Sequence, residues 1–170
     1  VTNLWATRGS GAPLTILAGH TDVVPTGPLD QWQSDPFTPE IRDGVLYGRG
    51  AADMKSGLAG MICAVERLID SAANLPGTLA FLITSDEEGL ALHGTRYVVK
   101  VLAERGIRPD YAIVGEASSN AVLGDRIVVG RRGSLCSLAL AAFEGVSVHV
   151  ETLMPVGGAL LMAVAVENVT

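Results

Sequence analysis

Side chains that can bind a divalent metal ion follow three short apolar runs of this sequence. A further side chain of this kind lies in a glycine-rich turn. They are His20, the pair Glu87 and Glu88, Glu116 and, in the turn, Asp53. Imidazole nitrogen and carboxylate oxygen, without thiolate, suit Zn²⁺, Mn²⁺ or Co²⁺. A bridging carboxylate also allows two ions about 3.5 to 4 Å apart, an arrangement that favours hydrolysis by lowering the pKa of water. These residue types therefore predict a metal-dependent hydrolase.

Each of these features has a simpler explanation when it is taken alone. Asp53 with Ser56 would begin a helix, because Asp and Ser are good N-terminal caps. His20 would be a loop histidine, and the three acids at 86–88 would form a solvated turn. Three consecutive acids repel one another, however, and the next basic residue along the chain is Arg96. A bound cation would offset this repulsion more directly. The coincidence of all four features favours one shared site.

The apolar runs predict the elements that would bring these side chains together. Runs at residues 14–18, 78–84 and 110–114 are short and apolar, as buried strands are. Apolar residues three and four positions apart predict helices over 58–69 and 95–105. The alternation is typical of an α/β fold, with a mostly parallel or mixed sheet and helices on both faces. The carboxyl ends of such strands meet at one edge, where these sheets bind their ligands.

A division of roles follows from these positions. One metal ion would be held by His20, Asp53 and Glu116. A second ion would share Asp53 and take Glu88. In an extended backbone Glu87 points away from Glu88, which leaves Glu87 as a general base for the attacking water.

Neighbouring residues would hold these ligands in place. Asp22 follows His20 by two residues and is positioned to accept the second ring proton, as the usual partner of a metal-bound histidine does. Gly48 and Gly50 permit the tight bend that would fix the direction of Asp53. Asp22 is therefore predicted to orient the histidine.

Composition limits the partners and the compartment. The 170 residues carry a formal net charge of -6, with a pI near 4.9, and no basic patch compensates, so nucleic acid and an anionic membrane surface are excluded as partners. The uncharged apolar stretch at 156–166 is shorter than the roughly 20 residues that span a bilayer. Cys63 and Cys136 lack a CxxC spacing, which predicts buried thiols in a reducing compartment, the cytoplasm. The length fits one domain or a larger domain cut short.

Taken together, the motifs resemble the M20 family of dizinc amidohydrolases and peptidases. The matching segments are, in order, GHTDVVP at 19–25, WQSDPF at 32–37, DGVLYGRGAADMK at 43–55, TSDEEG at 84–89, VGE at 114–116 and GRRGS at 130–134. The resemblance covers residues 1–134 and implies an incomplete catalytic domain, with Zn²⁺ as the cofactor and Co²⁺ as a substitute. The roles that it implies are zinc ligands at His20, Asp53 (bridging), Glu88 and Glu116, the general base at Glu87 and the histidine-orienting acid at Asp22.

The resemblance also indicates a substrate class. Within the family it is strongest to enzymes that remove an acyl group from an amino acid with several carboxylates, so cationic donors are expected near the site. Arg131, Arg132 and Ser134 are the candidates. Either arginine could instead cap a strand or pair with Asp125. Other interpretations left open are another acyl-amino-acid deacylase, a dipeptidase, or a metal-binding remnant without catalysis.

Residues 135–170 depart from the family pattern. They contain no Lys or Arg, and the family's second domain, which forms a lid and a dimer and lends a histidine to the partner's active site, is largely absent. His149, in GVSVHV at 145–150, is a candidate for that histidine, although a core or surface position explains it equally well. This apolar tail would complete the sheet, pack on a partner as in a homodimer, or be a remnant of the dimerisation domain. The family's C-terminal metal-binding histidine is also absent, and His93 is a candidate for its place.

Overall fold

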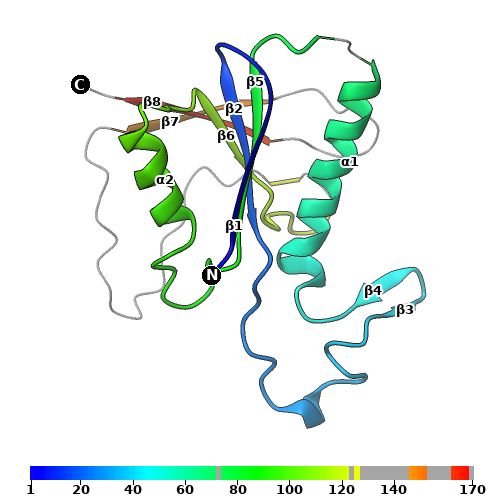
Figure 1. Ribbon diagram of the computed structural model, residues 1–170. Coiled ribbons are helices and arrows are strands. Elements are labelled where there is room, and N and C mark those ends of the chain that lie inside the picture. The colour runs from blue at the N-terminus through cyan, green and yellow to red at the C-terminus, as the bar shows by residue number, and fades with distance from the viewer. Residues whose placement is uncertain (72–73, 123–124, 127–145, 153–161, 169–170) are drawn as a thin grey trace.

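The computed structural model describes residues 1–71, 74–122, 125–126, 146–152 and 162–168. In chain order its elements are β1 (Asn3–Gly9), β2 (Leu14–His20), the short helical turn η1 (Leu29–Gln31), β3 (Glu40–Arg42), β4 (Val45–Tyr47), the turn η2 (Ala51–Lys55), α1 (Ser56–Ser71), β5 (Thr78–Thr84), α2 (Thr95–Glu104), β6 (Tyr111–Val114), β7 (Val146–Thr152) and β8 (Met162–Asn168) (Figure 1). The predicted strands and helices correspond to β2, α1, β5, α2 and β6, so local apolar patterning located each of them.

Six of the described strands form one mixed sheet in the order β1-β5-β2-β6-β8-β7. The central strands β5, β2 and β6 run parallel, while β1 pairs antiparallel with β5 at one edge. On the other side β8 pairs antiparallel with β6, and β7 pairs antiparallel with β8. His20 at the end of β2 lies beside Thr84 at the end of β5. The mixed α/β sheet confirms the predicted fold class.

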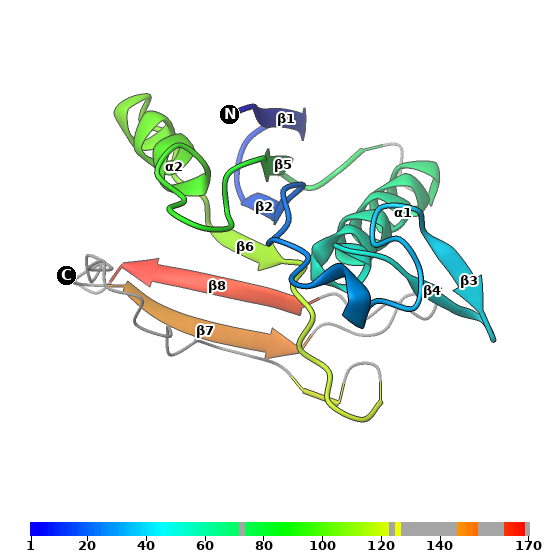
Figure 2. The ribbon, with the colours of Figure 1, turned by 90° about the horizontal axis from the view of Figure 1, so that it is seen from below.

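The two helices cover opposite faces of this sheet (Figure 2). Alternate residues of a strand point to opposite faces, and β2 shows this directly. Ile16 packs in a buried cluster with Leu102 of α2, whereas Leu17 packs in a second buried cluster with Leu58 of α1. Burying side chains of this size contributes about 1.5–3 kcal/mol each. Apolar contact with β2 therefore holds a helix on each face, as the sequence predicted.

The segment between β2 and η2 lies outside the sheet and carries a hairpin that the sequence analysis did not predict. The hairpin of β3 and β4 projects away from the sheet at the lower right of Figure 1. The loop before it contains two aromatic residues, Trp32 and Phe37. Trp32 is half-buried, donates a 2.9 Å hydrogen bond from Nε1 to the carbonyl oxygen of Thr26, and lies with its ring centroid 5.1 Å from the Arg49 guanidinium. Phe37, in contrast, is 67% exposed.

The prediction of a buried thiol is also wrong for Cys63. Its side chain is exposed on α1, because Leu58 and Met61 form the buried face of this helix and Cys63 lies on a different side. Cys136 lies outside the described residues.

The tail at 135–170 contributes two described strands. β7 and β8 pair with each other and extend the sheet beyond β6. The division of the chain at residue 134 stays a prediction, because most of the tail lies outside the described part. Within the described part, none of the helices has the length and apolar character needed to cross a membrane.

Candidate metal centre

His20 ends β2 and is the centre of the site. Its side chain is 1% exposed, and its ring nitrogen Nε2 faces three carboxylates. This nitrogen lies 3.1 Å from Oδ1 of Asp53, 3.3 Å from Oε1 of Glu116 and 3.8 Å from Oε2 of Glu87. The acids come from the turn before α1, the segment after β6 and the loop after β5. The parallel order of β5, β2 and β6 therefore gathers them at one edge.

A tight turn between Gly50 and Lys55 presents Asp53 to the histidine. Gly50 adopts a φ of +78°, a left-handed conformation that glycine reaches without strain. The N–H of Lys55 then donates to the carbonyl oxygen of Gly50 at 3.0 Å. Asp53 itself is extended (φ -118°, ψ 101°), and the peptide bond after it is cis. Nζ of Lys55 donates a 2.7 Å hydrogen bond to the carbonyl oxygen of Thr21, which ties the turn to the end of β2.

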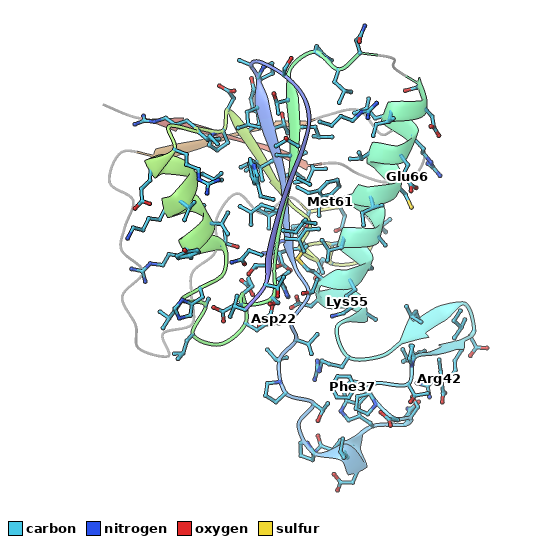
Figure 3. The ribbon with its side chains drawn as sticks, viewed as in Figure 1. Asp22, Phe37, Arg42, Lys55, Met61 and Glu66 are labelled. Atoms are coloured by element: carbon cyan, nitrogen blue, oxygen red, sulfur yellow. The ribbon has the colours of Figure 1, made fainter. Side chains whose placement is uncertain are left out.

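Asp22 joins the end of β2 to the loop that follows β5. Its Oδ2 accepts the backbone N–H groups of Glu87 at 3.0 Å and Glu88 at 2.9 Å. Its main-chain oxygen lies 3.0 Å from Nδ1 of His20, whereas its Oδ1 lies 3.6 Å from that nitrogen. The carboxylate was predicted to accept the ring proton, but the main-chain oxygen is the nearer acceptor and the carboxylate holds the acidic loop. Figure 3 shows Asp22 and Lys55 at the same end of the sheet.

Two groups of three side chains in the described residues could hold a metal ion. One consists of His20, Asp53 and Glu88, and the other of His20, Glu87 and Glu116, with the ligand atoms of each group within 4.8 Å of one another. The predicted set of His20, Asp53 and Glu116 is not one of these two groups, although both acids lie close to Nε2 of His20. All five residues offer nitrogen or oxygen donors of the kind that bind Zn²⁺, Mn²⁺ or Co²⁺. The donor set therefore fits a divalent ion, while the separate roles of Glu87 and Glu88 stay a prediction.

The crowding of acids shifts the pKa of two groups. Burial raises the pKa of Glu88, and the negative charges of Asp53 and Glu87 raise it further. Burial lowers the pKa of His20, but the hydrogen bond with the main-chain oxygen of Asp22 and the neighbouring carboxylates outweigh this effect, so the pKa is raised overall. Part of both shifts therefore comes from the negative charges that surround one imidazole. A divalent cation would offset those charges.

The remaining predicted site residues are not placed by the structure. His149 lies in β7, where only its backbone position is described. The candidates for substrate contacts lie outside the described residues: Arg131, Arg132 and Ser134. Their roles stay predictions.

Two residues that the sequence analysis missed support the site. Met54 is 0% exposed, and its Sδ accepts the backbone N–H of His20 at 3.2 Å. Asp86 accepts the backbone N–H of His93 on Oδ2 at 2.7 Å, which closes the acidic loop. His93 itself belongs to neither ligand group of the described residues. Asp86 stands in the acidic run and was visible as a candidate, whereas an apolar residue beside Asp53 gives no chemical signal.

A comparison with protein families bears directly on this centre. A family model described as peptidase family M20/M25/M40 matches residues 16–168. The chain belongs to peptidase family M20/M25/M40. The matched segment of this M20-family chain contains every residue of the two ligand groups, and it extends past residue 134, where the motif resemblance ended.

Curated relatives of this M20-family chain share one name. It is 59% identical over 150 residues to a succinyl-diaminopimelate desuccinylase of Stenotrophomonas maltophilia (strain K279a), covering 88% of this chain and 40% of the relative. It is 63% identical over 135 residues to a succinyl-diaminopimelate desuccinylase of Azoarcus sp. (strain BH72), covering 79% of this chain and 36% of the relative. The chain thus spans about two fifths of the length of the curated relatives it matches.

Solved structures of the same family share the fold. The M20 family metallo-carboxypeptidase Sso-CP2 from Sulfolobus solfataricus matches with a TM-score of 0.60 and 24% identity, over 68% of this chain and 26% of that chain. Human carnosine dipeptidase 1 matches with a TM-score of 0.58 and 30% identity, over 71% of this chain and 26% of that chain. The fold of this chain is therefore similar to that of a solved M20-family structure.

Proposed function

We propose that this chain carries the metal-dependent site of an enzyme that hydrolyses the amide bond of N-succinyl-LL-2,6-diaminopimelate to succinate and LL-diaminopimelate. The observation that carries the proposal is the convergence of acids on Nε2 of His20 at the edge of the sheet. Relatives that are 59% and 63% identical to the chain are named for this reaction, which supports the choice of substrate.

Zn²⁺ is the proposed ion, with Co²⁺ as a functional substitute. His20, Asp53 and Glu116 would hold one ion, and Asp53 with Glu88 would hold a second. When bound, such ions lower the pKa of water and stabilise the negative charge that develops on the carbonyl oxygen under attack. The absence of thiolate from the two ligand groups of the described residues supports ions that accept oxygen and nitrogen donors.

Glu87 is the proposed general base. Its Oε2 lies 3.8 Å from Nε2 of His20, and its side chain is 48% exposed, so the carboxylate is close to a proposed ligand and also accessible to water. Its backbone is held by Asp22. The carboxylate would take a proton from water as the oxygen bonds to the amide carbon. It would then give that proton to the amide nitrogen as the carbon–nitrogen bond breaks, so one side chain serves both steps.

The negative charge of the proposed substrate requires cationic groups near the site, and the arginines that the resemblance indicates could provide them. N-succinyl-diaminopimelate carries three carboxylates, and they would approach a chain of net charge -6. Guanidinium groups bind carboxylates through two parallel hydrogen bonds and offset that repulsion. We therefore assign Arg131, Arg132 and Ser134 to the substrate carboxylates.

The proposal also extends to assembly and compartment. The family resemblance implies a homodimer, with His149 as a candidate for the histidine lent to the partner subunit. The two cysteines lack the spacing of a CxxC pair, and on this ground we infer a reducing compartment, the cytoplasm.

A dipeptidase is the second candidate, because human carnosine dipeptidase 1 shares 30% identity with this chain. The same centre would then cleave the amide bond of a dipeptide. The two candidates differ in the charge of the substrate, since a dipeptide lacks the succinyl carboxylate.

An assay of the Zn²⁺-loaded chain separates these functions. N-succinyl-LL-2,6-diaminopimelate, N-acetylornithine and the dipeptide carnosine are supplied in parallel, and the released succinate or amine is measured. The proposal predicts succinate release at the highest rate. Carnosine cleavage without succinate release favours the dipeptidase, acetylornithine cleavage favours another deacylase, and bound zinc without any turnover favours a metal-binding remnant.

Glu87→Gln tests the general base within the same assay. We expect a loss of at least about 100-fold in rate, because general bases typically contribute that much or more, with zinc content unchanged. Glu66→Gln makes the same change on the exposed side of α1 and should leave the rate unchanged. A Glu87→Gln variant that loses zinc would make Glu87 a ligand rather than the base.

A further inference from the structure

Met54 lies directly after Asp53 and is enclosed by the part of the fold that supports the ligands. Its side chain is 0% exposed and packs in the cluster that joins β2, β6 and α1. Asp53, the residue before it, is 61% exposed. The turn η2 therefore points one side chain towards the proposed ions and the next into the core.

The sulfur of Met54 makes a directional contact with the histidine. Sδ accepts the backbone N–H of His20 at 3.2 Å. On the β6 side of β2 the paired residues end at Ala18 and Val114, so the ladder stops before it reaches this N–H. A thioether is a weak acceptor, but here it takes the place of the missing strand partner.

Two glycines make room for the Met54 side chain because they lack a β-carbon. A β-carbon at position 19 would lie 2.6 Å from Cε of Met54, and one at position 115 would lie 3.2 Å from the same atom. Gly19 immediately precedes His20, and Gly115 immediately precedes Glu116. The Met54 side chain thus lies against the backbone beside two proposed ligands, while its own backbone is continuous with a third.

We propose that Met54 is a positioning residue that sets the separation of Asp53, His20 and Glu116 for metal binding. An unbranched thioether is suited to this place because it fills an irregular gap and also offers an acceptor. Leucine would fill much of the volume but would leave the His20 N–H without its acceptor. The inference rests on the proposed metal site and adds a residue that does not touch the ion.

Met61 provides a matched control for Met54. It is 6% exposed, belongs to the same cluster and lies against Gly115, but the sulfur contact with the His20 N–H belongs to Met54. Met54→Leu and Met61→Leu therefore cause the same chemical change in the same core. A packing role alone predicts equal effects of the two substitutions, whereas a positioning role predicts that Met54→Leu has the larger effect on Zn²⁺ binding and on the His20 amide.

The test compares the unaltered chain with these two variants in three measurements. Zn²⁺ is titrated into each metal-free protein, hydrogen exchange is measured at the His20 amide, and urea denaturation reports the stability of each metal-free protein. We expect Met54→Leu to bind Zn²⁺ at least about tenfold more weakly, the scale typical of residues that support ligands from outside the coordination sphere. Its His20 amide should exchange faster, and its denaturation midpoint should lie below that of Met61→Leu, because only Met54→Leu leaves the buried His20 N–H without its acceptor. Met61→Leu should match the unaltered chain in Zn²⁺ affinity and in His20 exchange.

Each other outcome overturns the inference in a distinguishable way. Equal Zn²⁺ affinity in Met54→Leu and the unaltered chain removes the positioning role and leaves the metal site intact. Equal weakening in both variants reduces Met54 to a packing residue. An unaltered chain that binds no Zn²⁺ overturns the metal site and this inference together. If Met54→Leu does not fold, norleucine in place of methionine removes sulfur with the unbranched shape retained, and unchanged affinity and His20 exchange would then contradict the proposal.

Discussion

Oδ2 of Asp22 accepts the backbone N–H of Glu88 at 2.9 Å, although the two residues are 66 positions apart in the chain. The same oxygen accepts the neighbouring N–H of Glu87 at 3.0 Å. A single carboxylate therefore joins the strand that carries the histidine to the loop that carries two of the acids. We therefore expect the position of that loop to depend on Asp22.

Replacing Asp22 with alanine should loosen this loop. Two backbone N–H groups would lose a charged acceptor, and leaving such groups unpaired costs about 1–3 kcal/mol. We expect Asp22→Ala to lower the free energy of unfolding by about 2 kcal/mol and to weaken Zn²⁺ binding about tenfold or more. Asp22→Asn keeps an accepting oxygen and should lose less in both measurements, which are urea denaturation and Zn²⁺ titration.

Asp70→Ala is the control for this pair, because Asp70 is exposed on α1, away from the ligands. It should leave both quantities within experimental error of the unaltered chain. An Asp22→Ala variant that behaves like Asp70→Ala would show that the loop holds its place without the carboxylate.

The approach of α1 to the site depends on Gly57. A β-carbon at this position would collide with the main-chain oxygen of Gly115, the residue before a ligand. Gly57→Ala should therefore lower the free energy of unfolding by about 1–3 kcal/mol, the range for overpacking in a core. Denaturation of the metal-free chain measures the loss.

Gly60 lies on the same helix, and here we expect an alanine substitution to stabilise the chain. A β-carbon there meets nothing within 4 Å, so Gly60→Ala should stabilise the chain by about 1 kcal/mol through helix propensity alone. Similar effects of the two substitutions would argue against the close contact at Gly57.

The metal-free chain should lose stability as the pH rises. The pKa values of Glu88 and His20 are raised above their ordinary values of 4.5 and 6.5, so the folded chain holds more protons than the unfolded chain. The unfolding free energy therefore falls from pH 4.5 up to the raised pKa of Glu88, and falls again from pH 6.5 up to the raised pKa of His20.

Zn²⁺ competes with these same protons, so its stabilising effect should grow over the range in which the metal-free chain weakens. Urea denaturation at several pH values, with Zn²⁺ and with a chelator, measures both trends. A metal-free chain that gains stability across both windows would contradict the raised pKa values.

Local patterning explains why so much of the sheet was predictable. The runs that became β2, β5 and β6 are apolar on both sides because a helix covers each face, and the acids after them necessarily emerge at one edge. β1 and the β3–β4 hairpin depend on pairing between strands, which periodicity within one segment does not reveal. Cys63 was misjudged for a related reason, since α1 carries more apolar residues than its contact with the sheet buries, and Ile62 is 44% exposed.

The site was predictable to the extent that its chemistry is visible in residue types. His20 and Glu116 lie at or just after the carboxyl ends of neighbouring parallel strands. Because such ends meet at one edge of the sheet, where ligands bind, the two residues were expected to lie close together. The contact of Met54 with His20 had no such signal, because an apolar side chain beside an acid is compatible with many structures. The Asp22 carboxylate was predicted to accept the ring proton of His20, whereas the main-chain oxygen of Asp22 is the nearer acceptor. The sequence did not predict the hydrogen bonds of this carboxylate with the backbone of Glu87 and Glu88.

Titration of Zn²⁺ into the metal-free chain, followed by calorimetry, tests the central claim most directly when two matched variants accompany it. Asp53→Asn removes the charge of the proposed bridging ligand, while Asp43→Asn makes the same change at an exposed position with a φ of +50° that asparagine tolerates. We predict saturable Zn²⁺ binding by the unaltered chain and by Asp43→Asn, and none over the same concentration range by Asp53→Asn. Equal binding by Asp53→Asn and the unaltered chain, or no binding by the unaltered chain, would contradict the account.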